Sequence, residues 1–234
     1  MQIQEVFDRR RFVFLDGGMG TQLQQRGLQP GQKPELAALE MPDVLTAIHR
    51  DYTAAGADIL LANTFGANAK KLAGCGHSVE EVVSASIACA RRAGQETSAL
   101  VALDIGPLGE LLAPAGTLAF EDAYEEFAQV IRAGAAAGAD LVFLETMTDL
   151  YELKAAILAA KENCTLPIFT SMSFESRGRT FTGCTVESYA VTAAGLGADA
   201  IGINCSLGPA EILPFAQRLC RSVPAGLPVF VKPN

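Results

Sequence analysis

Residues 138–144 read Gly-Ala-Asp-Leu-Val-Phe-Leu, and the tripeptide Gly-Ala-Asp recurs at residues 56–58 and 197–199. Each copy follows a segment of helical spacing and precedes a short apolar run. A glycine that ends a helix, a short turn and a buried strand together make an αβ loop. The repeat therefore predicts β-strands that alternate with α-helices.

Seven short apolar runs lack polar alternation, as expected of parallel strands covered on both faces. They are residues 12–15, 58–62, 99–103, 141–144, 167–171, 200–203 and 228–231. Between them lie segments with helical spacing, and Pro42 and Asp149 are helix-start signals. These helix candidates are residues 44–55, 79–93, 121–137, 150–161, 186–196 and 209–221. We predict an α/β protein of one domain, residues 1–234, with the fold of a (β/α)₈ TIM barrel that lacks its eighth βα unit.

The rival architecture is a doubly wound open sheet. Such a sheet usually carries a glycine-rich dinucleotide fingerprint after its first strand, with an acidic residue at the end of the second. The candidate loop here, residues 17–21, reads Gly-Gly-Met-Gly-Thr and does not match GxGxxG. The second run ends in Leu61-Ala62-Asn63, without an acidic residue. The barrel is therefore preferred.

Composition excludes several classes of protein. Half of the 234 residues are apolar, which excludes a disordered chain and allows a core without disulfides. The 26 acidic residues outnumber 18 basic ones, so no basic stripe predicts a nucleic-acid partner. The six scattered cysteines are expected to be reduced thiols. The cluster Arg9–Arg11 precedes only four apolar residues, and no run reaches the roughly 18–20 residues of a membrane span. A cytoplasmic protein without membrane contact is predicted.

Each apolar run ends in a polar or small residue. In a barrel, the carboxyl ends of the strands carry the active site, so a ring of such residues predicts a polar pocket. Any one of them is also an ordinary turn or capping residue. The ring comprises Asp16, Asn63, Asp104, Glu145, Ser171, Asn204 and Lys232.

This inventory limits the chemistry. His49, expected on a helix surface, and His77, in a solvated loop, lie away from the strand ends, so neither a Ser-His-Asp triad nor a His-rich metal site is expected. Lys232 fits either a Schiff-base lysine of an aldolase or an ordinary ion-pair partner. Cys205 fits a buried small side chain, a nucleophile or a soft metal ligand. Without a neighbouring histidine to activate it, metal ligand is the better functional interpretation.

The chain resembles the homocysteine S-methyltransferase family, and within it the N-terminal homocysteine-binding barrel of the cobalamin-dependent methionine synthases. Seven motifs carry the resemblance in order along the chain. They are DGGMGT (16–21), NTF (63–65), DIGP (104–107), ETM (145–147), GRTFTG (178–183), GINCSLGP (202–209) and KPN (232–234).

The resemblance implies a set of site residues. Family members hold Zn²⁺ with three cysteines, of which Cys205 matches one, while the adjacent pair of a GGCCGT motif has no counterpart here. Asn234 is a tentative further ligand through its amide oxygen. Zn²⁺ deprotonates the substrate thiol, so no side-chain base is assigned. The implied substrate-binding residues are Asp16 and Glu145 for the ammonium, the loop at Gly17 and Gly18 for the carboxylate, and Asn63, Thr64 and Ser206 around them.

The implied function is zinc-dependent methylation of homocysteine to methionine. The methyl group would come from methylcobalamin, on the methyltetrahydrofolate route, with the cobalamin-binding and methyltetrahydrofolate-binding modules on separate domains or proteins. Two alternatives remain open. The same barrel could use betaine or S-methylmethionine as donor, or the chain could be a non-catalytic fragment that binds homocysteine.

Overall fold

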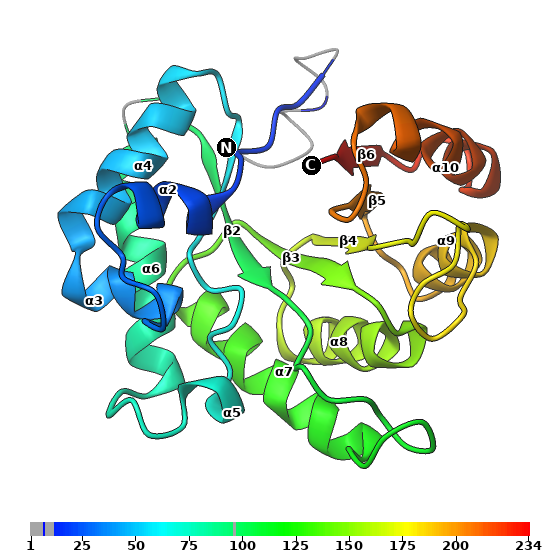
Figure 1. Ribbon diagram of the computed structural model, residues 1–234, viewed down its shortest axis with the longest axis horizontal. Coiled ribbons are helices and arrows are strands. Elements are labelled where there is room, and N and C mark those ends of the chain that lie inside the picture. Colours follow the sequence, from blue (N-terminus) through cyan, green and yellow to red (C-terminus); the bar gives the residue numbers. More distant parts are fainter. Residues whose placement is uncertain (1–6, 8–11, 96) are drawn as a thin grey trace. The chain divides into compact units, whose positions relative to one another are not determined.

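A computed structural model describes residues 7, 12–95 and 97–234 of the chain (Figure 1). The Arg9–Arg11 cluster lies outside the described residues. The chain divides into two compact units, the first formed by Met1–Ile105 and Gln129–Val142, the second by Gly106–Ala128 and Phe143–Asn234. Each unit is described by itself, and the assignment of one domain stays a prediction.

Six strands follow the order β1-β2-β3-β4-β5-β6 in the sheet. In the first unit, β1 (Ile59–Leu61) pairs in parallel with β2 (Leu100–Ile105). In the second, β4 (Ile168–Met172) pairs in parallel with β5 (Ala200–Asn204), and β5 with β6 (Val229–Lys232). β3 (Leu141–Met147) crosses the division. The α/β class with parallel strands is confirmed, whereas the complete barrel and its missing unit stay predictions.

The first predicted run, residues 12–15, forms only an isolated parallel bridge between Leu15 and Ile59. The other six runs are strands, displaced by a few residues at most. Strands β1 to β5 are buried along almost their whole length, which explains their continuous apolar sequence.

All six predicted helices are present with ends shifted by a few residues. They are α4 (Pro42–Ala54), α6 (Val79–Gly94), α7 (Phe120–Ala136), α8 (Leu150–Asn163), α9 (Val186–Gly195) and α10 (Pro209–Ser222). Pro42 is the first residue of α4, and the Asp149 carboxylate caps α8 by accepting from the Tyr151 N–H. The short elements α2 (Met19–Gln25), η1 (Pro34–Leu36), α3 (Ala37–Glu40) and α5 (Ala69–Leu72) were not predicted.

The three Gly-Ala-Asp loops share one geometry. Gly56, Gly138 and Gly197 have φ of +103°, +86° and +84°, the left-handed conformation that ends a helix most readily at glycine. The following aspartates then bind the neighbouring strand. Asp58 accepts from the Phe14 N–H at 2.9 Å, Asp140 from Val101 at 2.7 Å and Asp199 from Ile168 at 2.8 Å. The repeat noted in the sequence therefore joins the start of β3 to β2 and the start of β5 to β4, whereas before β1 it joins the chain to the Phe14 segment, which is not a strand.

The core of the first unit gathers side chains of α2, α3, α4 and α6, among them Leu23, Leu45, Ile48 and Cys89. His49 of α4 belongs to this interior, because its relative exposure is 0%. The expectation of a helix-surface histidine is therefore wrong. The reason is that α6 packs along α4, so more of the surface of α4 is buried than its sequence pattern predicts.

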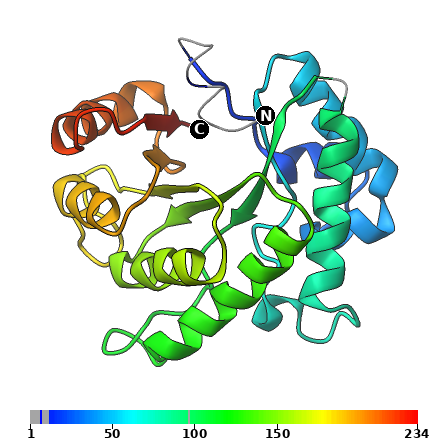
Figure 2. The ribbon, with the colours of Figure 1, turned by 180° about the vertical axis from the view of Figure 1, so that it is seen from behind.

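In the second unit, helix α9 packs against α8 and α10, beside the strands (Figures 1 and 2). The rings of Phe143 in β3, Phe169 in β4 and Phe230 in β6 pack together, with centroids 5.0 to 6.1 Å apart. Gly202 of β5 makes room for this cluster, because a Cβ there would stand 2.4 Å from the Phe230 ring. A larger residue at this position would displace the ring.

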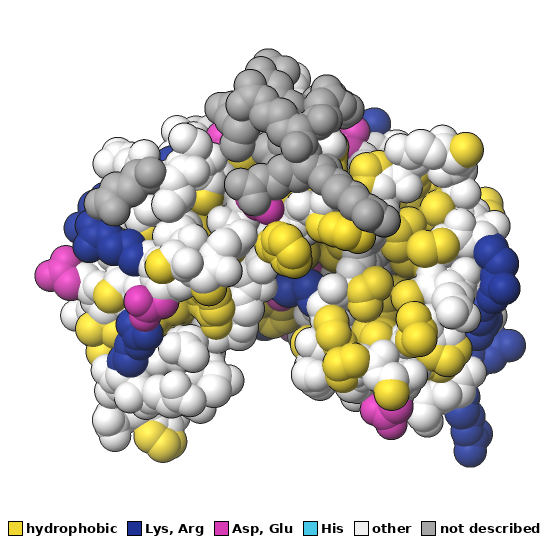
Figure 3. Space-filling view, turned by 90° about the horizontal axis from the view of Figure 1, so that it is seen from above, with side chains coloured by type: hydrophobic (Ala, Val, Ile, Leu, Met, Phe, Trp, Pro, Cys, Tyr) yellow, Lys and Arg dark blue, Asp and Glu magenta, His cyan; other side chains and the backbone are white. Residues whose placement is uncertain are grey.

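Hydrophobic side chains also reach the surface, and Figure 3 shows a group of them over the part of the chain that ends in α10 and β6. Leu213 of α10 and Val231 of β6 are among the exposed large side chains of this unit. No helix within the described residues has the length and apolar character needed to cross a membrane. All six cysteines are free, as predicted.

Candidate functional site

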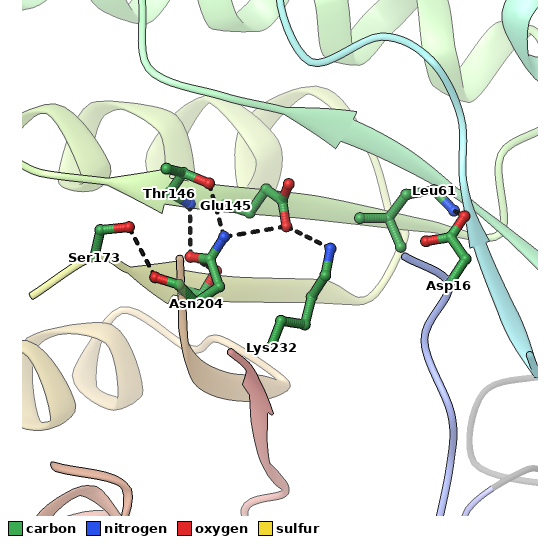
Figure 4. Close-up of polar contacts among 8 residues, drawn as sticks. Asp16, Leu61, Glu145, Thr146, Ser173, Asn204 and Lys232 are labelled. Atoms are coloured by element: carbon green, nitrogen blue, oxygen red, sulfur yellow. Dashed lines mark hydrogen bonds and ion pairs between the residues drawn. The ribbon is translucent and has the colours of Figure 1, made fainter. Parts of the chain in front are cut away.

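The carboxyl ends of β3, β5 and β6 bring Glu145, Asn204 and Lys232 together (Figure 4). The Lys232 Nζ donates to the Glu145 Oε2 at 2.8 Å, and the Asn204 Nδ2 approaches the same oxygen at 3.4 Å. The side chains of Glu145 and Lys232 are only 12% and 20% exposed. Parallel strands end on the same side of a sheet, so their last polar side chains meet there.

Asn204 connects this ion pair to β4 and to the end of β3. Its Oδ1 accepts from the Thr146 backbone N–H at 3.0 Å and from the Ser171 hydroxyl at 2.9 Å. Its Nδ2 also donates to the Thr146 Oγ1 at 2.7 Å, and its backbone carbonyl accepts from the Ser173 hydroxyl at 2.8 Å. A buried amide with all its hydrogen-bonding positions in use has one fixed orientation. Asn204 is therefore rigid.

Glu145 has one oxygen occupied and one available. Its Oε2 is the acceptor for both Lys232 and Asn204. Within the described part of the chain, its Oε1 makes no hydrogen bond, and Figure 4 shows it on the side away from the two donors. A carboxylate oriented in this way can accept a charge-assisted hydrogen bond from a cationic ligand group.

The backbone at these strand ends has an uncommon conformation. Thr146, Cys205 and Ser206 have φ of +61°, +60° and +63°, and the only other described non-glycine residue with positive φ is Ser98. For a β-branched residue such as Thr146 this conformation is a true outlier and costs energy. Residues held this way concentrate at functional sites, so the strain marks the same place as the polar network.

Cys205 follows β5 and is partly buried, Ser206 is exposed, and Asn234 is exposed beyond β6. The Cys205 N–H donates to the Lys232 carbonyl at 3.0 Å, and the Asn234 N–H to the Leu207 carbonyl at 3.1 Å. The two tentative metal ligands therefore lie on adjacent segments that are joined through their backbones.

A zinc ion does not fit the donor set found here. Zinc sites use three or four protein ligands, yet no three His, Cys, Asp or Glu side chains of the described residues are placed to share a metal. Cys205 brings one thiol. The described residues do not make up a zinc site by themselves.

In the first unit, Asp16 is buried after the Leu15 bridge, and its Oδ2 accepts from the Leu61 N–H at 2.8 Å. Gly17 and Gly18 follow, beside Tyr52, whose hydroxyl donates to the Gly18 carbonyl at 3.0 Å. A Cβ at Gly17 would lie 3.0 Å from the Tyr52 ring, so only glycine fits well there. These residues form a second candidate set, separate from that of the second unit.

Asn63 and Thr64 have mainly backbone partners. The Asn63 amide donates to the Pro34 carbonyl at 2.6 Å. The Thr64 hydroxyl donates to the Asp104 carbonyl at 2.8 Å and accepts from the Asp104 N–H at 3.1 Å. Such contacts are typical of residues that hold loops in place, and the roles of both residues in substrate binding stay predictions.

The contacts of His77 and Lys232 show the surroundings of these two remaining candidates. His77 is exposed in its loop, as predicted, and its Nδ1 lies 3.7 Å from the Glu81 Oε2. Lys232 forms an ion pair with Glu145, which is one of the two roles that the sequence allowed, and the Schiff-base role stays a prediction. The sequence analysis placed Asn204 and Ser171 at strand ends and Thr146 in the ETM motif, but it gave none of them a role, and it did not single out Ser173. Their positions at or just after the ends of strands were the available signal.

Comparisons with known proteins identify a family model and several relatives that resemble this chain. A family model described as homocysteine S-methyltransferase matches residues 13–234. The methionine synthases of Mycobacterium tuberculosis and Mycobacterium leprae are each 34% identical to this chain, over 96% of it and 20% of the relative. The chain thus spans about a fifth of the length of the curated relatives it matches. The metallated homocysteine methyltransferase MmuM of Escherichia coli superposes with a TM-score of 0.86 at 24% identity, covering 98% of this chain and 85% of that one. This likeness shows a shared fold.

Proposed function

The chain belongs to the homocysteine S-methyltransferase family, and we propose that it binds homocysteine and presents the thiol for methylation to methionine. The observation that carries the proposal is the Glu145 carboxylate, with one oxygen held by Lys232 and Asn204 and the other available to a ligand. It stands at the end of β3, among strained and hydrogen-bonded residues that keep it in place.

Homocysteine is a zwitterion, and its ammonium is the group that a fixed carboxylate recognises best. In the proposed complex, the Glu145 Oε1 accepts a hydrogen bond from this ammonium. A charge-assisted bond of this kind contributes about 1.5–3 kcal/mol. It orients the amino acid so that the thiol end is left for the transfer reaction.

We assign the first-unit residues Asp16, Gly17 and Gly18 to substrate binding as well, on the family resemblance. Asp16 would accept from an ammonium, and the backbone N–H groups of the two glycines would donate to a carboxylate. This set is tested by its own variants, Asp16→Asn and Gly17→Ala. Ser206, exposed and strained beside Cys205, is proposed to line the same substrate region as Cys205.

The methyl donor is proposed to reach this chain on other modules. The two curated relatives are methionine synthases about five times as long as the segment matched here. We infer cobalamin-binding and methyltetrahydrofolate-binding modules as partners, with methylcobalamin as the immediate donor, in a cytoplasmic setting. Betaine and S-methylmethionine are the alternative donors. Methionine formed from either of them without cobalamin would overturn this assignment.

Cys205 is proposed as one thiolate ligand of the zinc ion that the family resemblance implies, with Asn234 as a tentative neighbour. One thiolate is too few, so a zinc ion at Cys205 would need at least two more donors from outside the described residues. What the described residues support by themselves is recognition of the amino acid.

The test is homocysteine binding measured by calorimetry on the chain and on Glu145→Gln. Removing the charge but keeping the shape should weaken binding by about 10- to 100-fold. Glu162→Gln is the matched control, because Glu162 lies exposed on α8 and accepts a hydrogen bond from the Tyr124 hydroxyl at 2.7 Å, away from Glu145 in the sequence. Equal affinity of Glu145→Gln and the unmodified chain would overturn the proposed function.

A further inference from the structure

Lys232 donates to Glu145 from a different strand, and its ammonium also lies 5.4 Å from the centre of the Phe143 ring. Both contacts are to β3, so the lysine fixes the end of this strand from β6. A largely buried ion pair is costly to desolvate, and well-packed apolar residues would often stabilise a protein as much or more. Stability alone therefore gives little reason for this pair.

We propose that Lys232 is a positioning residue for ligand recognition, which together with Asn204 holds the Glu145 Oε2 so that the Oε1 faces the ammonium of an amino-acid ligand. The inference rests on the proposed function and adds to it. It assigns the preference for ligands that carry an α-ammonium to a lysine that does not itself touch that group.

The geometry explains why two donors are needed. The terminal torsion of a glutamate is broad, so the two carboxylate oxygens exchange places easily unless one is held. Asn204 is rigid but reaches the Oε2 only at 3.4 Å, whereas Lys232 reaches it at 2.8 Å with a full charge. Without Lys232, the carboxylate keeps only the weaker bond. It then loses both its orientation and the cation that offsets its burial.

The charges also suit an amino acid. Glu145 and Lys232 sum to zero, and so do the ammonium and carboxylate of a zwitterionic ligand. Ligand binding therefore adds no net charge to the region around Glu145. A ligand that lacks the ammonium gains nothing from a correctly oriented Glu145.

The experiment compares two ligands, homocysteine and 4-mercaptobutanoate, which is the same molecule without the amine. Binding of each is measured by calorimetry to the unmodified chain, Lys232→Met, Lys232→Arg and the control Lys161→Met, an exposed lysine of α8. We expect Lys232→Met to weaken homocysteine binding about 10-fold or more, while 4-mercaptobutanoate changes less than about twofold. Lys232→Arg should restore most of the preference, and Lys161→Met should change nothing.

Equal losses for both ligands in Lys232→Met would mean a merely structural role and would overturn the inference, as would an unchanged preference. If Lys232→Met does not fold, Lys232→Gln keeps a donor without the charge and must show the same selective loss. The two proposals fail differently. If the unmodified chain does not prefer homocysteine, or Glu145→Gln has no effect, the proposed function falls and the inference with it. If both behave as expected while Lys232→Met retains the preference, only the role of Lys232 falls.

Discussion

His49 is an ionisable side chain enclosed in an apolar interior. It is fully buried in α4, and neither ring nitrogen has a hydrogen-bond partner among the described residues. Burial lowers the pKa of His49 from 6.5 to about 4. The folded chain therefore holds this ring neutral at pH values where an unfolded chain would protonate it.

This predicts a stability that falls with acidification. Between about pH 7 and pH 4, the unfolded state binds a proton at His49 that the folded state refuses, so the free energy of unfolding decreases as the pH falls. The full effect is about 3 kcal/mol. Denaturant unfolding at pH 7.5, 6, 5 and 4 should show a smaller acid loss in His49→Leu than in the unmodified chain.

Ile48, the residue before His49 in the same core, gives the control for this measurement. Ile48→Val removes one buried methylene and no titratable group, so it should lower the free energy of unfolding by a similar amount at every pH. Parallel pH profiles for His49→Leu and the unmodified chain would contradict the prediction.

At the residue scale, the sequence indicated which polar side chains would lie together but not which hydrogen bonds connect them. Glu145 and Lys232 follow apolar runs, and strand topology alone places such residues at one edge. The bonds that Asn204 makes to Thr146 and Ser171 depend on side-chain rotamers and on a left-handed Thr146, which no local pattern encodes. His49 was misplaced for a related reason, since its burial depends on α6 packing over α4.

At the element scale, the aspartates of the Gly-Ala-Asp loops all accept a hydrogen bond from a backbone N–H, but they differ in their exposure to solvent. Asp58 is buried and accepts from the Phe14 N–H at 2.9 Å, whereas Asp199 is exposed and accepts from the Ile168 N–H of β4 at 2.8 Å. Solvent can replace a lost acceptor at the exposed site but not at the buried one.

We therefore predict unequal costs for equivalent substitutions. Asp58→Ala should lower the free energy of unfolding by about 2 kcal/mol, and Asp199→Ala by less than about 1 kcal/mol. Asp58→Asn, which keeps an oxygen acceptor, should cost less than Asp58→Ala. Chemical denaturation measures all three. A cost for Asp199→Ala equal to that of Asp58→Ala would show that burial does not set the strength of these bonds.

The elements themselves were predictable in proportion to their length. Helices of 10 to 17 residues have enough turns for an apolar periodicity to be read, and α4 to α10 were found except for α5. α3 and α5 have four residues each, which is about one turn and leaves no period. The run at residues 12–15 was read correctly as apolar, yet only Leu15 pairs as a bridge.

At the scale of the whole molecule, the described residues account for ligand recognition but not for metal binding. The amino-acid contacts proposed for Glu145 are complete within the second unit. The metal contacts are not, since Cys205 supplies one thiol and no three His, Cys, Asp or Glu side chains of the described residues are placed to share a metal. The sheet topology explains why the Glu145 contacts lie together. The parallel strands follow one another in the order of the sequence, so β3, β5 and β6 all end on the same side of the sheet.

The donor set predicts weak zinc binding by this chain. With one thiolate in place of the three or four ligands of a protein zinc site, the purified chain should hold well below one zinc per chain after dialysis against a zinc-buffered solution. Elemental analysis measures the content, with Cys205→Ser as the test variant and Cys220→Ser, an exposed thiol, as its control. Homocysteine binding through Glu145 should still be measurable in the zinc-poor protein. A content near one zinc per chain that disappears only in Cys205→Ser would contradict the prediction, because the chain would then supply further donors that the described residues do not place beside Cys205.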